Sequence, residues 1–250
     1  MFQGFYNLSS QMLTQNRNLN VISNNMANVS TAGFKSDRLI SSNFRNEMIS
    51  RIGNKDKSPA AIGKMSDIRS AVSTVTDYSN CGYTISDSPF DMALTGDGFF
   101  VVQTPEGEAY TRNGSFSLDE EGYLTLPSVG RVMGENGPIA FDTDAFWVEE
   151  DGSIYRQRDA SLIGRLRVVD FEDYNTDLLK DGTNVFVGTG AEPAAVRPRI
   201  QWKAVEVSNV SPVEEMTAMM SSQRALQSAA QVLKMYDQLT GKIVSQLGPA

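Results

Sequence analysis

Residues 5–29, FYNLSSQMLTQNRNLNVISNNMANV, carry apolar side chains at intervals of seven residues, and this spacing decides the fold. Two such registers, which correspond to the a and d positions of a heptad, continue for more than three repeats. They predict an amphipathic helix that packs on a second helix. Asn, Ser, Gln and Thr occupy most other positions and have modest helix propensity, so the helix needs that partner. The two registers are Phe5, Met12, Leu19 and Met26, and Leu8, Gln15, Ile22 and Val29.

The other end of the chain repeats this pattern. Residues 213–248 read VEEMTAMMSSQRALQSAAQVLKMYDQLTGKIVSQLG. Ser211 suits an N-cap and Pro212 suits the first helical position, while Glu214 and Glu215 complement the helix dipole. These signals predict a second long helix with its own heptad stripe. Its registers are Met219, Leu226, Leu233, Thr240 and Leu247, and Ser222, Ala229, Tyr236 and Ile243.

Two narrow apolar stripes, one at each end of the chain, must both be covered. We therefore expect the N- and C-terminal helices to pair as a coiled coil, so that the chain leaves and returns through one end of the molecule. Residues 1–35 then form the N-terminal helix of an inner α domain, and residues 205–250 form its C-terminal helix. Adjacent positions such as Met216, Met220 and Ala230 remain available for a neighbouring subunit.

Between the helices, turn signals separate short apolar or alternating runs. FFVVQ at 99–103 and RLRVVDF at 165–171 are examples of such runs. Dipeptides such as Asn136-Gly137 supply the positive φ angles that tight hairpins need. They predict a central antiparallel β-rich domain at residues 82–204 and an extended connector at residues 36–81. The predicted fold class is therefore α+β.

Composition excludes several classes of function. The net charge of −8 offers no basic face for nucleic acid, and no basic amphipathic stripe points to a membrane surface. Histidine is absent and Cys81 is the only cysteine, which excludes a Ser-His-acid triad and a cysteine-based zinc site. The first residues do not resemble a conventional signal peptide, and no apolar run is long enough to predict a membrane-spanning helix.

Some residues superficially resemble an active site. Asp87, Asp91 and Asp97 cluster in sequence, and paired carboxylates can bind calcium or transfer protons, but their spacing matches no calcium loop. Residues 142–144, Asp-Thr-Asp, begin like such a loop but lack a glutamate at its twelfth position. Cys81 has no histidine to activate it. We expect no enzyme activity, catalytic residue, metal or cofactor.

Three collinear motifs resemble one family. VISNNMANVSTAGFK at 21–35 resembles the N-terminal signature of flagellar rod and hook proteins. LTGDGFFVV at 94–102 and YTRNGSFSLDEEGYL at 110–124 resemble that family's central motif, and VEVSNVSPVEEMTAMMSSQRA at 205–225 its C-terminal one. The motif residues that carry the resemblance are Asn24, Asn25, Asn28, Gly33, Phe34, Gly98, Phe99, Phe100, Arg112, Gly114, Phe116, Ser208, Asn209 and Val210.

This resemblance implies a structural subunit of the flagellar basal-body rod, in the periplasm, that assembles through its terminal helices into a hollow axial tube. It implies copies of itself and other rod and hook axial proteins as partners, and export through the flagellar type III apparatus without a cleaved signal peptide. The chain length and the modest central domain resemble those of rod proteins rather than the longer hook subunits. MGENGPI at 133–139 and the compact length favour a proximal over a distal rod protein. Partly disordered termini that fold on assembly are a further hypothesis.

The first motif also has a plainer interpretation. Asn24, Asn25 and Asn28 can cap the helix end or bridge neighbouring chains, and Gly33 fits a C′ position that ends the helix. A well-capped helix followed by an ordinary loop explains the same residues without any assembly role.

Two other functions remain open at this point. A β module for adhesion or carbohydrate binding, presented on a helical stalk, would need an exposed aromatic patch, for which Trp147, Tyr155 and Trp202 are candidates. A histidine-free acid hydrolase would use the region of Asp87 and Asp91.

Overall fold

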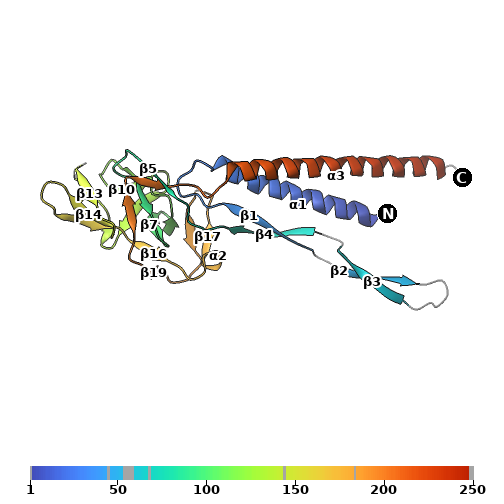
Figure 1. Cartoon of the computed structure of the whole chain (residues 1–250), viewed down its shortest axis with the longest axis horizontal. Helices are drawn as coiled ribbons and strands as arrows, with labels where there is room; N and C mark the ends of the chain where they lie inside the picture. The colour runs from blue at the N-terminus through green and yellow to red at the C-terminus, as the bar shows by residue number, and fades with distance from the viewer. Residues whose placement is uncertain are drawn as a thin grey trace. The chain divides into compact units, whose positions relative to one another are not determined.

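The structure is a computed structural model, and it describes residues 2–43, 46–52, 59–66, 69–142, 145–182 and 184–247. The chain forms two compact units, each built from segments that are distant in the sequence (Figure 1). The first unit comprises Met1–Ala27, Asp37–Val75 and Ser211–Ala250, and the second comprises Asn28–Ser36 and Thr76–Val210. A long helix near each end and antiparallel strands between them confirm the α+β prediction.

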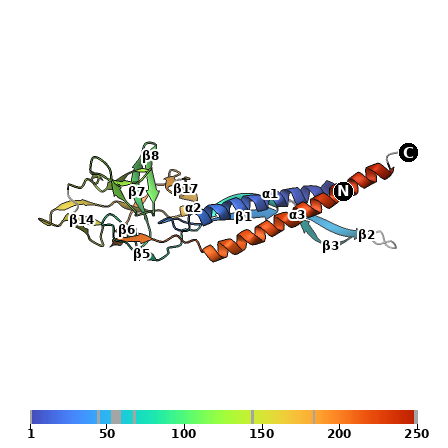
Figure 2. The same ribbon diagram turned by 90° about the horizontal axis from the view of Figure 1, so that it is seen from above.

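Two long helices of the first unit contact each other and run in opposite directions (Figures 1 and 2). α1 spans Phe2–Ala27 and α3 spans Pro212–Leu247. α3 begins as the sequence predicts, because the Glu215 N–H donates to the Ser211 carbonyl at 3.0 Å. Hydroxyl groups within the helices bond back to earlier carbonyls, as Thr14 does to Ser10 at 2.9 Å.

α1 ends earlier than predicted. Its last residue is Ala27, and the Thr31 N–H then donates to the Asn28 carbonyl at 3.1 Å to form a turn. The prediction that Gly33 ends this helix as its C′ residue is therefore wrong. Gly33 and Val29 both lie in the second unit, beyond the helix.

Antiparallel strand pairs complete the first unit. β1 (Asp37–Asn43) pairs with β4 (Arg69–Thr76), and β2 (Asn46–Ile52) pairs with β3 (Pro59–Ser66). β1 also contacts α1. The segment predicted as an extended connector therefore contains four strands.

The second unit is built on a sheet whose central strand is β7 (Phe99–Thr104). Alternate β7 side chains enter two different cores, as the two-residue period of a strand requires. Phe100 and Val102 lie in the larger core, and Phe99 and Val101 lie in the smaller one. The sheet order is β17-β18-β8-β7-β11-β10-β9, with β12, β16 and β19 paired beside it.

Smaller sheets complete the second unit. β13, β14 and β15 form one of them, and the late strands β20 and β21 return to pair with the early strands β6 and β5. The unit therefore requires residues from both ends of its sequence. The remaining bounds are β5 (Tyr83–Ile85), β6 (Met92–Leu94), β8 (Gly107–Thr111), β9 (Ser117–Leu118), β10 (Leu124–Leu126), β11 (Gly130–Gly134), β12 (Gly137–Pro138), β13 (Phe146–Val148), β14 (Ser153–Arg156), β15 (Leu162–Arg165), β16 (Val168–Asp170), α2 (Tyr174–Asp177), β17 (Leu178–Lys180), β18 (Phe186–Gly188), β19 (Ala194–Ala195), β20 (Ile200–Trp202) and β21 (Ala204–Glu206).

Among the described residues, neither long helix has an apolar stretch sufficient to cross a bilayer.

Candidate functional site

Segments from three distant parts of the chain meet inside the second unit. Gly33 and Lys35 come from the turn after α1, Arg112 follows β8, Glu206 ends β21, and Asn209 lies three residues further on. We call these five residues the motif junction. Each of the three sequence motifs contributes at least one of them, so the junction explains why the motifs occur together.

The motif junction contains a buried group of charges. The Lys35 Nζ donates to Glu206 Oε1 at 2.7 Å and to the Ser79 carbonyl at 2.8 Å. The Arg112 Nη1 lies 3.6 Å from Glu206 Oε2, and it donates to the Gly96 carbonyl at 2.8 Å. The side chains of Lys35, Arg112 and Glu206 are 1 %, 2 % and 1 % exposed. One carboxylate therefore compensates two cations away from solvent.

Burial is the main cause of a lowered pKa at Lys35. The Glu206 carboxylate opposes this change by stabilising the ammonium, and the nearby Arg112 guanidinium adds to it by repulsion. The protonated lysine thus depends on Glu206, which makes this carboxylate the central member of the junction.

The backbone at Gly33 approaches Arg112 closely. Gly33 has a φ of +65°, and its N–H donates to the Glu206 carbonyl at 2.9 Å. A Cβ at this position would lie 2.4 Å from the backbone carbonyl carbon of Arg112. Both the left-handed conformation and the lack of space therefore require glycine.

Phe34 packs inward beside this turn. Its side chain is 3 % exposed, and the Lys180 Nζ lies 4.0 Å from the centre of its ring. The same ammonium donates to the Lys35 carbonyl at 2.6 Å, so one side chain fixes both the ring and the backbone.

Asn209 hydrogen-bonds to two other segments of the second unit, one that leads into β1 and one that follows β4. Its Oδ1 accepts from the Ser36 N–H at 2.7 Å, and its Nδ2 donates to the Asp77 carbonyl at 2.7 Å. Its own N–H donates to the Phe34 carbonyl at 3.3 Å. Beside it, Ser208 and Val210 are buried.

The central-motif residues other than Arg112 serve packing. A Cβ at Gly114 would lie 1.6 Å from the Met92 carbonyl oxygen, so two chain segments cross there at backbone contact. Gly98 has a φ of +109° and precedes β7. Phe100 and Phe116 meet edge to face at 5.2 Å in the larger core, whereas Phe99 lies in the smaller core beneath the Arg112 guanidinium.

Polar residues mark the contact between α1 and α3. The Asn18 Nδ2 donates to Ser222 Oγ at 3.1 Å, and the Asn25 Nδ2 donates to Glu215 Oε1 at 2.8 Å. Asn18 and Asn25 are seven residues apart, as are Glu215 and Ser222. Asn25 also accepts from the Asp37 N–H at 3.0 Å and thereby holds the start of β1.

The same register continues toward the N-terminus. Gly4 lies fourteen residues before Asn18, and Tyr236 lies fourteen residues after Ser222. A Cβ at Gly4 would stand 3.0 Å from Tyr236 Oη, so these two residues are also in contact. α1 and α3 therefore meet at whole heptad intervals in opposite directions.

The predicted stripe residues differ in exposure. Ile22 is 5 % exposed, whereas Phe5 and Ile243 are each 39 % exposed. The side chain of Leu247 lies outside the described part of the structure. Of the motif amides, Asn25 is buried, Asn28 is half-buried and Asn24 is exposed. Intermediate exposure is found at Leu8, Met12, Leu19, Met26, Val29, Met219, Leu226, Ala229, Leu233 and Tyr236.

An open groove of about 730 Å³ lies between the two helices, beside the polar contact line. Its α1 wall includes Met12 and Leu13, and its α3 wall includes Leu226, Ala230 and Leu233. Ser9, Asn16 and Gln227 complete the lining.

Two of the aspartates that superficially resemble an active site have structural partners. Asp91 is buried and accepts from Ser86 Oγ at 2.5 Å, and Asp97 accepts from Asn80 Nδ2 at 3.1 Å. Cys81 is exposed. No group of three or more His, Cys, Asp or Glu side chains is placed to hold a metal within the described ranges.

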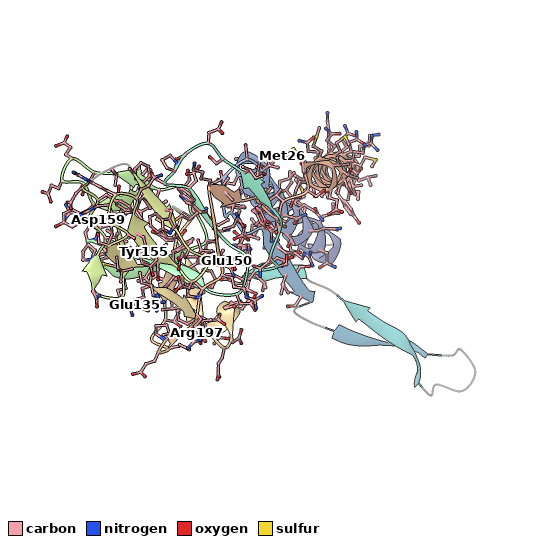
Figure 3. All side chains as sticks on the ribbon, turned by 60° about the vertical axis from the view of Figure 1, so that its left-hand side comes forward. Met26, Glu135, Glu150, Tyr155, Asp159 and Arg197 are labelled. Atoms are coloured by element: carbon pink, nitrogen blue, oxygen red, sulfur yellow. The ribbon has the colours of Figure 1, made fainter. Side chains whose placement is uncertain are left out.

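The three candidate aromatic residues do not form one patch. Trp202 packs against the larger core and donates to the Pro89 carbonyl at 2.8 Å. Trp147 and Tyr155 stack on each other at 5.5 Å across β13 and β14, and Figure 3 labels Tyr155.

Sequence reasoning missed several contact residues. Lys35 and Glu206 stood within the quoted motifs but were not selected, although a charged residue inside a motif is the signal that could have found them. Gly4, Asn18 and Glu215 were missed because heptad reasoning selects apolar positions, and these are small, polar or charged.

Three family models match the chain in sequence order. "Flagella basal body rod protein" matches residues 5–35, "Flagellar hook protein FlgE/F/G D1 domain" matches 93–156, and "Flagellar basal body rod FlgEFG protein C-terminal" matches 203–247. Each matched segment contains at least one residue of the motif junction.

Whole-length relatives agree with these matches. The chain is 32 % identical to the flagellar basal-body rod protein FlgG of Buchnera aphidicola subsp. Acyrthosiphon pisum, over 93 % of this chain and 95 % of the relative. It is 30 % identical to FlgG of Bacillus subtilis, over 98 % and 99 % of the two chains. It is 31 % identical to the rod protein FlgF of Caulobacter vibrioides, over 96 % and 95 %.

Proposed function

The chain belongs to the flagellar basal-body rod protein family, and from this premise we propose that it is a structural rod subunit that assembles through α1 and α3. Its relatives are named flagellar basal-body rod proteins. The site of function is then a set of contact surfaces and not a catalytic centre.

Exposed apolar side chains on α3 carry this proposal. Val213, Met216 and Met220 are 74 %, 57 % and 52 % exposed, and Met235 and Leu239 are 54 % and 57 % exposed. A soluble monomer gains nothing from displaying such side chains in rows, whereas an assembling subunit needs them. Flexible methionine side chains also tolerate the small differences between neighbouring environments in a helical array.

The heptad-spaced contacts between α1 and α3 support pairing of these helices as an antiparallel coiled coil. Repeated head-to-tail contacts between such pairs would build the wall of a hollow axial tube. Copies of this chain and other flagellar axial proteins are its partners, in the basal-body rod. Delivery through the flagellar type III export apparatus belongs to the same proposal.

The motif junction has a supporting role in this function. It holds the chain where it passes from α1 into the second unit and where it leaves for α3. The apolar stripe residues act in helix pairing, and the buried Lys35, Arg112 and Glu206 act in this junction.

The position along the rod stays a prediction. Matched relatives include proteins named FlgG and proteins named FlgF, and the preference for a proximal position rests on residues 133–139 and the compact chain length.

Deletion and complementation test the proposed function. A strain that lacks its own copy should not swim and should yield incomplete rods when hook–basal bodies are isolated. The wild-type chain should restore both properties, whereas a chain truncated before Ser211 should restore neither because it lacks α3. Normal rods in the deletion strain would contradict the proposal and favour a binding-module function.

A further inference from the structure

The α1–α3 pair carries two apolar features on opposite sides of α3. The first is the groove described above, whose α3 wall is formed by Leu226, Ala230 and Leu233. The second is a ridge formed by Met235 and Leu239, which are 54 % and 57 % exposed. Figure 3 looks nearly along α3 and shows side chains projecting from it on the sides turned away from α1.

The sequence spacing places the ridge opposite the groove. Met235 follows Leu226 by nine residues, and Leu239 follows Ala230 by nine residues. At about 3.6 residues per turn, nine residues make about two and a half turns, so each pair projects from opposite sides of the helix. The ridge thus repeats the spacing of the groove wall on the other side, displaced by about 13.5 Å along the axis.

The two features also match in chemistry and size. Met12, Leu13, Leu226, Ala230 and Leu233 give the groove apolar walls. Its volume of about 730 Å³ lies in the range of pockets that enclose groups larger than one side chain, about 300–1,000 Å³. The small side chain of Ala230 lies between two leucines on the α3 wall, and the space beside it has room for a branched side chain.

We propose that the ridge of one copy seats in the groove of the next, with parallel α3 helices staggered by nine residues. In this contact Met235 meets the partner copy at the position of Leu226, and Leu239 meets it at the position of Ala230. The inference rests on the proposed function and deepens it, because it names the two surfaces through which copies of this chain join.

Opposite surfaces make this contact heterologous. Each copy uses its groove toward one neighbour and its ridge toward the other, so the contact does not close at two copies and extends into an array. The other exposed row on α3 would behave differently. Met216 precedes Ala230 by fourteen residues, which is close to a whole number of turns, so Met216 lies on the groove side. A contact of that row with the same row of a second copy would close as a symmetric dimer.

Paired cysteine substitutions test the proposal in assembled rods. In a Cys81→Ser background, one chain carries Leu226→Cys with Met235→Cys, and a second carries Ala230→Cys with Leu239→Cys. Each pair lies on opposite sides of one helix and beyond the ~7 Å Cα separation that a disulfide tolerates, so every bond formed is between copies. Mild oxidation of isolated basal bodies should give a ladder of dimers, trimers and larger species in non-reducing electrophoresis.

Matched controls separate this contact from random collisions. Leu226→Cys with Lys234→Cys, an exposed position about 100° or more around the helix from both ridge side chains, should give at least tenfold less cross-linked product. Met235→Glu with Leu239→Glu should reduce the motile fraction at least tenfold. Gln223→Glu with Lys234→Gln changes the net charge equally, at exposed positions about 100° or more around the helix from the ridge, and should leave the motile fraction unchanged. Circular dichroism of the purified variants should show equal helix content, because all four positions are exposed.

The outcomes distinguish this proposal from the proposed function. Rods that contain the doubly substituted chain but give only monomers, or a product that stops at a dimer, would overturn the groove contact and leave the structural function standing. A deletion strain that builds complete rods would overturn the structural function itself.

Discussion

Neutralising Glu206 should destabilise the second unit strongly, because this carboxylate is the buried counter-charge of two cations. Glu206→Gln keeps the shape of the side chain but leaves Lys35 and Arg112, which are 1 % and 2 % exposed, without compensation. Removing one partner of a buried ion pair costs about 3–5 kcal/mol. At about 2–4 °C per kcal/mol for a chain of this size, the melting temperature should fall by about 6–20 °C.

Glu121→Gln is a matched control for this substitution. Glu121 lies 2.7 Å from Arg131, the same separation as between Glu206 and Lys35, but its side chain is 68 % exposed. Exposed ion pairs contribute about 0–1 kcal/mol, so the same chemical change should shift the melting temperature by no more than about 4 °C. The two sites differ in burial, and Arg131 also keeps Asp119 as a partner at 2.9 Å when Glu121 is neutralised.

Tryptophan fluorescence is the assay, because both tryptophans, Trp147 and Trp202, lie in the second unit and report its unfolding alone. Adding Lys35→Met to Glu206→Gln should cost less than the sum of the two single changes, by about 0.5–3 kcal/mol, since it removes one of the stranded cations. Equal melting temperatures for Glu206→Gln and Glu121→Gln would refute the claim that the junction is a desolvated group of charges.

Three further changes test other parts of the structure. Gly33→Ala should lower the free energy of unfolding of the second unit by at least about 1–3 kcal/mol, because its Cβ would meet the Arg112 backbone at 2.4 Å; Gly182→Ala, with no atom within 4 Å of the new Cβ, should change it little. Asn18→Leu with Ser222→Leu should raise the thermal stability of the helix pair but loosen its register. In that variant a disulfide between Gly4→Cys and Ala229→Cys, one heptad out of register, should form where the parent chain forms none. Asp151 has a lowered pKa, first because the Ser153 N–H donates to it at 3.0 Å and also because Arg165 pairs with it. Its folded pKa lies below its unfolded pKa, so its stabilisation is complete above about pH 3.9 and is lost as the pH falls through the folded pKa. Asp151→Asn should flatten this acid limb in melts recorded from pH 2 to pH 6, and an unchanged limb would contradict the assignment.

Local periodicity predicted the elements of this fold well. The apolar stripe over residues 5–29 predicted a helix that the structure places at Phe2–Ala27, and the run at 99–103 predicted the strand Phe99–Thr104. Such signals depend only on which face of an element meets apolar surroundings, and a sequence records this directly. The end of the first helix was misplaced because Gly33, which looked like a terminator, is required by a contact with Arg112 some eighty residues away.

The motif junction could not be predicted for a related reason. Lys35, Arg112 and Glu206 are seventy-seven and ninety-four residues apart along the chain, and no local pattern distinguishes a buried charge from a solvated one. The return of β20 and β21 to the early strands β6 and β5 brings these charges together. That pairing is a property of the topology and leaves no periodic trace in the sequence.

The contact line between the helices shows most clearly how assembly is encoded. Asn18, Asn25 and Gly4 form the α1 side of this contact line, so small and polar residues make part of the contact between the two helices. Polar pairs at fixed heptad positions stabilise less than apolar ones but specify a single register. Other apolar side chains of α3 lie outside this contact line. Met235 and Leu239 are exposed on one side of the helix, and the groove wall lies on the other. A helix pair that holds its register with amides and keeps Met235 and Leu239 exposed is poorly suited to remain a monomer and well suited to assembly.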